Sequence, residues 1–161
     1  MAYKQISDQT SGFFIPCVSL FGPGCVKEVG SKAKDLGAKK ALIVTDQGLN
    51  KAGVPDIIIK HLNEQGIDSH VFAGAEPNPT DKNVHDGVTA YQDNGCDFII
   101  SLGGGSSHDC AKGIGLVTAG GGHIRDYEGI DKSKVPMTPL IAINTMADTA
   151  SEMTRIFIIT N

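Results

Sequence analysis

The sequence predicts an α/β fold, an open parallel sheet with helices on both faces and an N-terminal edge strand in front of it. Two observations carry this prediction. Short apolar runs alternate with segments of helical periodicity, and three of these runs start near residues 40, 68 and 97, about 28 residues apart. That interval is the size of a strand–helix–strand unit, and such alternation is typical of a parallel sheet covered on both sides.

Each element is identified by an apolar run or a helical face and by the turn residues that bound it. Thr80 precedes a helical face as a plausible cap, and Pro16 confines the first extended segment to a sheet edge. Expected strands are 40–45, 68–72, 97–102, 139–143 and 154–160, after an extended segment at 12–21; expected helices are 23–36, 54–65, 80–94 and 107–118. We expect one Rossmann-like domain over residues 1–161.

Composition excludes several classes of protein. The 161 residues carry 14 basic and 18 acidic side chains, a net charge of −4, without a basic block, which argues against a nucleic-acid or anionic membrane surface. No apolar run reaches the ~18 residues of a membrane span, and no secretory signal is visible. The four widely spaced cysteines do not suggest a disulfide framework. We therefore expect a cytoplasmic protein.

Polar and small residues follow four of the expected strands, at the edge where parallel sheets bind ligands. The strongest signal is Gly103-Gly-Gly-Ser-Ser-His-Asp109, between a strand and a helix. Glycines bare the backbone amides, and a helix N-terminus attracts phosphate, so this loop predicts an anion site, with Ser106 or Ser107 as a cap or donor. The competing interpretation is a tight turn with an ordinary serine cap.

Individual side chains keep two interpretations each. Asp46 closes the first clear strand, where a carboxylate either binds a ribose diol or caps a helix. Asp109 either complements the helix dipole or orients a substrate, and Lys112 is expected to be solvated or salt-bridged. His108 and His123 lack partners at metal-ligand spacing and are expected to be structural. The residues alone indicate a nucleotide-binding domain and leave the reaction open, because no nucleophile with a matched base stands out.

The run G-G-G-S-S-H-D-C-A-K at 103–112 resembles the signature of the iron-type (group III) alcohol dehydrogenases. Within that family the chain is similar to 1,3-propanediol dehydrogenases, methanol dehydrogenases and lactaldehyde reductases. Five further motifs occur in the family's order: Phe13-Phe-Ile-Pro16, Phe21-Gly-Pro-Gly24, Leu42-Ile-Val-Thr-Asp46, Glu76-Pro-Asn-Pro-Thr80 and Thr149-Ala-Ser-Glu-Met-Thr-Arg155. The resemblance covers essentially the whole chain.

The resemblance implies the NAD-binding half of a dehydrogenase that transfers hydride between a small primary alcohol or diol and NAD. It places Asp46 at the adenosine ribose, favouring NAD over NADP, and Asp109 near the nicotinamide and substrate. The other implied cofactor-binding residues are Asn78, Gly103, Gly104, Gly105, Ser106, Ser107, Thr145 and Thr149. The family's helical C-terminal domain, absent from this chain, supplies the Asp and His ligands for Fe²⁺ or another divalent metal. We therefore expect no metal site and no activity in these 161 residues.

Two residues depart from the family pattern T-T-A-G-T-A/G-S-E. Met146 replaces a hydroxyl that could donate to the cofactor, and Asp148 puts a negative charge beside the expected pyrophosphate. Two alternatives stay open: a cofactor domain of the glycerol dehydrogenase or dehydroquinate synthase kind, and a non-catalytic nucleotide-binding or dimerisation fragment. An unpaired N-terminal edge strand favours a homo-oligomer.

Overall fold

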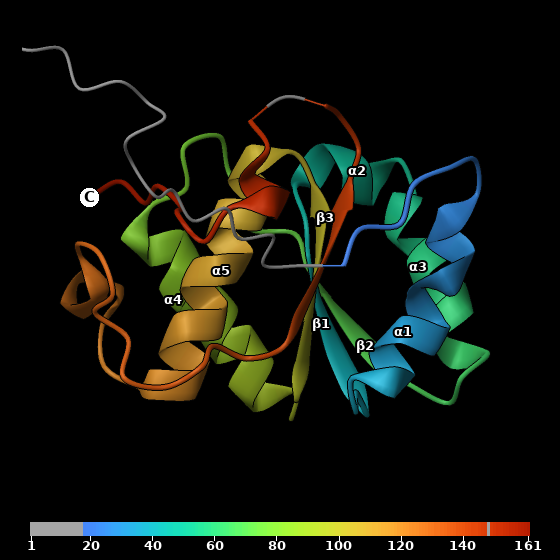
Figure 1. The fold of residues 1–161 in the computed structure, drawn as a ribbon, viewed down its shortest axis with the longest axis horizontal. Coiled ribbons are helices and arrows are strands. Elements are labelled where there is room, and N and C mark those ends of the chain that lie inside the picture. Colours follow the sequence, from blue (N-terminus) through green and yellow to red (C-terminus); the bar gives the residue numbers. More distant parts are fainter. Residues whose placement is uncertain (1–17, 148) are drawn as a thin grey trace, which may run out of the picture.

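A four-stranded parallel sheet in the order β2-β1-β3-β4 forms the centre of the structure (Figure 1). The computed structural model describes residues 18–147 and 149–161. Its strands are β1 (Lys40–Val44), β2 (Asp68–Phe72), β3 (Phe98–Gly103) and β4 (Leu140–Asn144). Crossing from β2 through β1 to β3 reverses the strand order, so the sheet has the switch point at which such folds bind ligands.

The described residues form five α-helices, of which the first precedes β1 and the other four connect the strands. They are α1 (Val29–Asp35), α2 (Gln47–Lys51), α3 (Val54–Asn63), α4 (Asp81–Asp93) and α5 (Gly105–Gly120), with short 3₁₀ turns η2 (Cys25–Glu28), η3 (Ile124–Tyr127) and η4 (Ser151–Met153). The expected helix over 23–36 is thus a 3₁₀ turn followed by a short α-helix. None of the described helices is long and apolar enough to cross a membrane.

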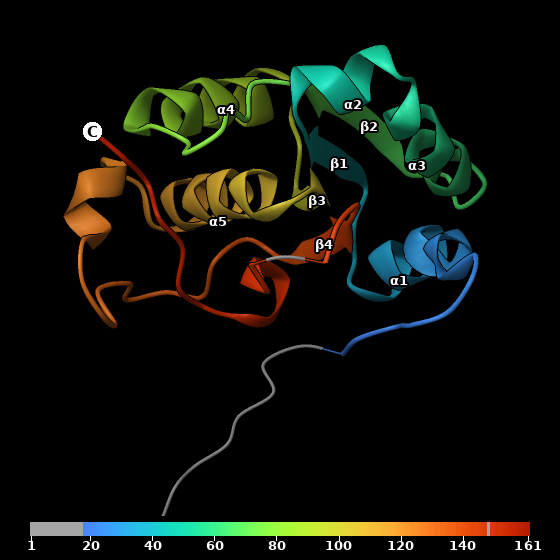
Figure 2. The ribbon, with the colours of Figure 1, turned by 90° about the horizontal axis from the view of Figure 1, so that it is seen from above.

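The helices pack in two layers, with α1 and α3 on one face of the sheet and α4 and α5 on the other (Figure 2). Alternation along β1 divides the core, since Leu42 and Val44 pack toward α4 and α5 while Ala41 and Ile43 pack toward α1 and α3. Every residue of β3 is buried, as expected for a central parallel strand. This double covering confirms the predicted fold class.

The predicted strand over 154–160 is wrong. This segment joins no strand of the described sheet and makes one isolated parallel bridge, between Thr160 and Thr80. Apolar residues there alternate between packing on the core, as Phe157 does, and strong exposure, as Ile156 does at 69%. A period of two therefore indicated an extended backbone correctly, but not a partner strand.

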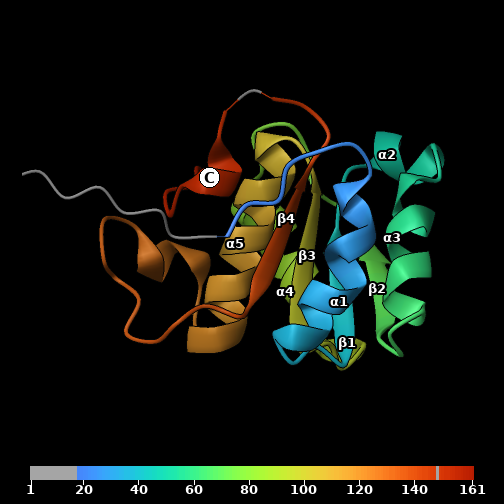
Figure 3. The same cartoon turned by 45° about the vertical axis from the view of Figure 1, so that its right-hand side comes forward.

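The expected N-terminal edge strand lies mostly outside the described residues, since these begin at residue 18 and the expected segment spans 12–21. Residues 18–21 have no regular secondary structure. The homo-oligomer expected through this strand therefore stays a prediction. The loops that follow the strands gather along one edge of the sheet (Figure 3).

Candidate functional site

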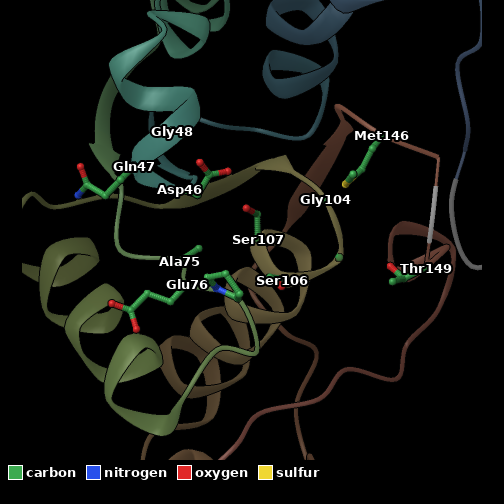
Figure 4. Close-up of a pocket in the computed structure, with 12 residues that line it drawn as sticks. Asp46, Gln47, Gly48, Ala75, Glu76, Gly104, Ser106, Ser107, Met146 and Thr149 are labelled. Atoms are coloured by element: carbon green, nitrogen blue, oxygen red, sulfur yellow. The ribbon is translucent and has the colours of Figure 1, made fainter.

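A cavity of about 440 Å³ opens at the carboxyl edge of the sheet, which is a usual size for a small-molecule site. Its walls come from the loops after β1, β2 and β4 and from the start of α5 (Figure 4). The lining residues are Asp46, Gln47, Gly48, Ala75, Glu76, Pro77, Gly104, Gly105, Ser106, Ser107, Met146 and Thr149. Segments separated by a hundred residues therefore build one site.

The N-terminus of α5 faces this cavity without a side-chain cap. Gly104 is the N-cap residue, and the first backbone bond of the helix runs from the His108 amide to the Gly104 carbonyl at 3.2 Å. The amides of residues 105–107 precede that bond and so have no intrahelical acceptor. Three amides and the dipole of a 16-residue helix together suit an anion. Neither Ser106 nor Ser107 caps the helix, contrary to the competing interpretation.

Close contacts explain why residues 103, 104 and 105 are all glycines. Gly103 has φ of 149°, a conformation that side chains rarely adopt, and a Cβ on it would collide with the Ser107 side chain. A Cβ on Gly104 would lie 2.8 Å from the Met146 sulfur, and one on Gly105 would collide with Thr149 Oγ1. The glycines therefore let the loop after β4 close against the start of α5, in addition to baring the amides.

Asp46 fulfils the capping interpretation and also lines the cavity. Its Oδ1 accepts a hydrogen bond from the Leu49 amide at 2.9 Å, which makes Asp46 the N-cap of α2. The carboxylate is half-buried, and in Figure 4 the Ser107 hydroxyl points toward it. Capping occupies Oδ1 and leaves the carboxylate's charge at the cavity wall, so the ribose interpretation is compatible with the cap.

The wall charges of the cavity are acidic. Its lining residues within the described part of the chain include two carboxylates, Asp46 and Glu76, and no lysine or arginine. An anion here would therefore depend on the backbone amides and the helix dipole, and a second phosphate beside Asp46 would be repelled. This charge pattern favours a ligand with its phosphates at α5 and neutral hydroxyls near Asp46.

Six of the nine expected cofactor-binding residues line the cavity: Asp46, Gly104, Gly105, Ser106, Ser107 and Thr149. The other three support its walls through the backbone. The Thr145 amide donates to the Gly103 carbonyl at 3.0 Å, which joins the ends of β4 and β3. Asn78, in a left-handed conformation with φ of 54°, accepts from Thr160 Oγ1 at 3.1 Å through its carbonyl.

Sequence reasoning missed the contribution of α2. Gln47 and Gly48 line the cavity, and Gln47 Nε2 donates to the Ala73 carbonyl at 3.0 Å, which joins α2 to the loop after β2. The only sequence signal for α2 was Asp46, an acidic residue suited to an N-cap directly after a strand. With five residues, α2 is too short to show a helical period. Met146 also lines the cavity, whereas Asp148 lies outside the described residues.

Asp109 is not among the residues that line the cavity. Its Oδ1 accepts from Ser151 Oγ at 2.6 Å, and its Oδ2 accepts from the Ile158 amide at 3.2 Å. Lys112, one turn further along α5, is 7% exposed and donates to the carbonyls of Ser151 and Ile156. Of the two expectations for Lys112, a solvated side chain is wrong and a salt bridge is confirmed, since Lys112 Nζ lies 4.0 Å from Asp109 Oδ1. Burial lowers the pKa of Lys112, while the carboxylates of Asp109 and Glu152 oppose that shift.

Two further buried groups fix α5 to the sheet. His108 is 1% exposed and lies 2.6 Å from both Ser101 Oγ and Asn144 Oδ1, through Nδ1 and Nε2 respectively. Burial lowers the pKa of His108, so a neutral ring donates from Nε2 and accepts at Nδ1. Burial raises the pKa of the Cys110 thiol to about 12. These groups are structural, as expected for His108.

Within residues 18–147 and 149–161, no group of three or more His, Cys, Asp or Glu side chains is placed to hold a metal ion. The side chains of these described residues therefore do not fit a metal centre.

Comparisons with known proteins identify the family. The family described as iron-containing alcohol dehydrogenase matches residues 16–161. Alcohol dehydrogenase 4 of Schizosaccharomyces pombe is 53% identical over 150 residues, and the NAD-dependent methanol dehydrogenase of Bacillus methanolicus is 48% identical over 151 residues. These alignments cover 93% and 94% of this chain but 36% and 40% of the relatives.

Solved structures agree with the sequence relatives. A crystal structure of 1,3-propanediol oxidoreductase superposes with a TM-score of 0.88 at 45% identity, covering 91% of this chain and 38% of that one. The chain thus spans about two fifths of the length of the proteins it resembles.

Proposed function

The chain belongs to the iron-containing alcohol dehydrogenase family, and we propose that it forms the NAD-binding half of a dehydrogenase for small alcohols. In this proposal residues 1–161 are one dinucleotide-binding domain, and hydride passes between NAD and a small primary alcohol, diol or the corresponding aldehyde. The observation that carries it is the uncapped N-terminus of the 16-residue helix α5, which faces the cavity at the switch point of the sheet.

The pyrophosphate of NAD would bind the amides of residues 105–107, with Ser106 and Ser107 as hydroxyl donors. These groups fit because Gly104 contributes no side chain and the helix dipole supplies the positive potential. Asp46 would accept from the adenosine ribose hydroxyls and repel the extra phosphate of NADP. Thr149, next to Gly105, would continue the wall toward the nicotinamide, while Gly103, Asn78 and Thr145 would hold the walls in place.

The metal chemistry of the family has no counterpart that we can assign here, since the described residues hold no ligand cluster. No step of the proposed reaction uses a metal held by these described residues. We propose that the 161-residue chain alone binds NAD but does not oxidise alcohols, with or without added Fe²⁺. Metal-assisted alcohol oxidation needs the ion to stabilise the developing alkoxide.

Titration calorimetry of the chain with NAD and with NADP tests the binding step. We expect NAD to bind, and NADP to bind at least about tenfold more weakly. As a matched pair, Gly104→Asp adds a carboxylate at the proposed phosphate site, and Gln92→Glu adds the same charge on the exposed end of α4. Loss of binding in both variants, or in neither, would contradict the phosphate assignment.

The catalytic step is tested by following NADH absorbance with 1,3-propanediol and ferrous iron. We expect no turnover above the buffer blank. Turnover that a chelator abolishes would show a metal site in the chain and overturn the proposal of inactivity. A non-catalytic nucleotide-binding fragment would also bind NAD without turnover. Adding a separate metal-binding domain of the family distinguishes it from the NAD-binding half of a dehydrogenase, because only the latter should then oxidise the alcohol.

We further propose a cytoplasmic protein that associates through its N-terminal segment. The three described cysteines, Cys25, Cys96 and Cys110, are all free, as in a reducing compartment. Light scattering of the chain and of a variant lacking residues 1–17 tests the association. A single common mass would contradict the role of that segment.

A further inference from the structure

Residues 151–160, which we call the strap, join two walls of the cavity. At the start of the strap, the Ser151 amide donates to Thr149 Oγ1 at 3.4 Å, and the Thr149 side chain lines the cavity. At its end, the Thr160 amide donates to the Pro79 carbonyl at 2.9 Å, and the Asp81 amide donates to the Thr160 carbonyl at 3.0 Å. The position of the strap therefore affects both the loop after β4 and the loop over residues 76–80.

The strap has little regular structure of its own. Apart from the short turn η4 and one isolated β-bridge, the strap has no regular secondary structure, and it is not a strand of the described sheet. Ile156 and Ile158 are 69% and 68% exposed, so only Phe157 and Ile159 pack against the core from this stretch. A segment with so few contacts depends on specific polar bonds for its position.

Two side chains of α5 supply most of those bonds, in addition to the ion pair of Arg155 with Asp131 at 3.0 Å. Lys112 Nζ donates to the Ser151 carbonyl at 2.5 Å, to Ser151 Oγ at 2.8 Å and to the Ile156 carbonyl at 3.0 Å. Asp109 accepts from Ser151 Oγ at 2.6 Å and from the Ile158 amide at 3.2 Å. Lys112 Nζ also donates to Thr154 Oγ1 at 3.5 Å, and it lies 4.0 Å from Asp109 Oδ1. Six hydrogen bonds from the two residues therefore hold both ends of the stretch 151–158.

We propose that Asp109 and Lys112 are positioning residues for the nucleotide cavity, which hold the strap on α5 and thereby fix Thr149 and the 76–80 loop around the cofactor. This inference rests on the proposed NAD binding. It assigns Asp109 to the strap and not to the nicotinamide or the substrate. The ammonium group of Lys112 faces four oxygen acceptors here, three of them within 3.0 Å. A buried cation without such acceptors would be strongly disfavoured.

The proposal predicts reciprocal coupling between NAD and the strap, because a ligand that binds the ordered walls must in turn stabilise them. Limited trypsinolysis measures this directly. Arg155 lies in the strap with a 75% exposed side chain, and cleavage after it reports release of the strap. Cleavage after Lys60 in α3, on the opposite face of the sheet, reports global unfolding.

Three variants and one control are compared. Lys112→Met removes four bonds to the strap, and Asp109→Asn removes the carboxylate charge. Ser151→Ala is a mild variant that removes only the hydroxyl bridging both residues. Lys82→Met, at a 76% exposed lysine paired with Asp86 on α4, is the charge-matched control. Ser151→Ala keeps the test decisive if Lys112→Met fails to fold.

In the wild type we expect NAD to slow cleavage after Arg155 at least about fivefold without affecting cleavage after Lys60. Ser151→Ala should bind NAD several-fold more weakly and Lys112→Met at least about tenfold more weakly. Both should be cut faster after Arg155, with the protection by NAD reduced. Lys82→Met should behave as the wild type. A purely structural role would speed both cleavages together and leave the protection by NAD unchanged.

Two results would overturn the positioning role. The first is faster cleavage after Arg155 with unchanged NAD affinity, since the strap would then not shape the cavity. The second is weaker NAD binding with unchanged cleavage after Arg155, since the effect would not pass through the strap. If the wild type itself failed to bind NAD, the proposed function would fall and the positioning role with it. Failure of the inference alone is thus distinguishable.

Discussion

Helices α4 and α5 begin at the same edge of the sheet, yet their first turns are built in opposite ways. Thr80 caps α4 in a capping box, in which its side chain accepts from the Asn83 amide and Asn83 Oδ1 accepts from the Thr80 amide at 2.8 Å. Gly104 begins α5 with no side-chain bond. One helix satisfies its own amides, and the other leaves them to the cavity.

The difference shows how the chain separates stability from binding. A cap contributes about 1 kcal/mol to a helix, and α5 forgoes it. In compensation, α5 is fixed by buried bonds further along, since His108 contacts Ser101 of β3 and Asn144 of β4. The proposed binding site therefore lies at a helix start that lacks a stabilising cap and is held by tertiary hydrogen bonds instead.

Adding a cap to α5 should have the largest effect, because it removes the difference between the two helix starts. Gly104 has φ of −96° and ψ of −165°, an extended conformation open to any residue, so Gly104→Asp can cap the helix as Thr80 caps α4. The new Cβ would lie 2.8 Å from the sulfur of Met146, which is 58% exposed and can move. We expect the melting temperature to be kept or slightly raised and the NAD affinity to fall about 100-fold.

The loss has two sources. The carboxylate would occupy the amides, and its charge would repel a phosphate by ~1 kcal/mol at 4 Å in water and ~4 kcal/mol at an effective dielectric constant of 20. Calorimetry and thermal melting measure the two quantities on the same sample. Retained NAD affinity in a stable Gly104→Asp variant would show that the phosphates do not bind at α5.

Asp46 combines a cap and a charge at the start of α2, and Asp46→Asn separates them. Asparagine caps as well as aspartate, so the free energy of unfolding should change by less than ~0.5 kcal/mol. Removal of the charge should reduce the preference for NAD over NADP by about tenfold, a change of 1.4 kcal/mol. Titration of both cofactors gives the ratio. An unchanged ratio would leave Asp46 with the capping role alone.

The sequence alone predicted the sheet and most of the cavity, because both depend on local patterns. Apolar runs located β1 to β4 within a residue or two, and the glycine run located the start of α5. Asp46 was equally well explained as a cap or as a ribose ligand, and the structure gives it the cap together with a place in the cavity wall. Such double roles are invisible in a one-dimensional pattern.

Residues whose roles depend on distant partners could not be predicted. Lys112 was expected to be solvated or salt-bridged, and its pairing with Asp109 is local to α5. Its burial was not expected, because a lysine is usually exposed and the acceptors that bury it lie about forty residues further along the chain. The stretch 154–160 was expected in a sheet because alternation shows an extended backbone without showing its partner. Both errors concern the same contact, since Lys112 binds the segment that was mistaken for a strand.

Removing the cap of α4 is the converse of capping α5 and has a smaller effect. Thr80→Ala should lower the free energy of unfolding by about 1 kcal/mol, because the Asn83 amide loses its acceptor. NAD affinity should change less than twofold, since Thr80 does not line the cavity. Urea denaturation and calorimetry measure the two. A large loss of NAD affinity at full stability would show that the two helix starts are not functionally separate.

The smallest expected effect is a dependence of stability on pH, which tests whether His108 fixes α5 in place of a cap. Burial lowers the pKa of His108 below the ordinary 6.5, and burial also lowers the pKa of His85. In the window between the lowered pKa and 6.5, the unfolded chain binds more protons than the folded chain. The free energy of unfolding should therefore fall as the pH falls below 6.5 and level off above it.

Urea denaturation at several pH values between 5 and 8 measures this slope, and His108→Gln and His85→Gln apportion it. Each glutamine removes one titrating group, so each variant should lose part of the slope, with the larger part lost in His108→Gln because His108 is the more deeply buried ring. An unchanged slope in His108→Gln would mean that His108 takes up protons equally well in the folded and the unfolded chain, and so keeps its bonds to Ser101 and Asn144 when protonated. A neutral His108 ring would then not be what holds the start of α5 in place of a cap. Some other interaction would have to explain why α5 is stable without the cap that α4 has.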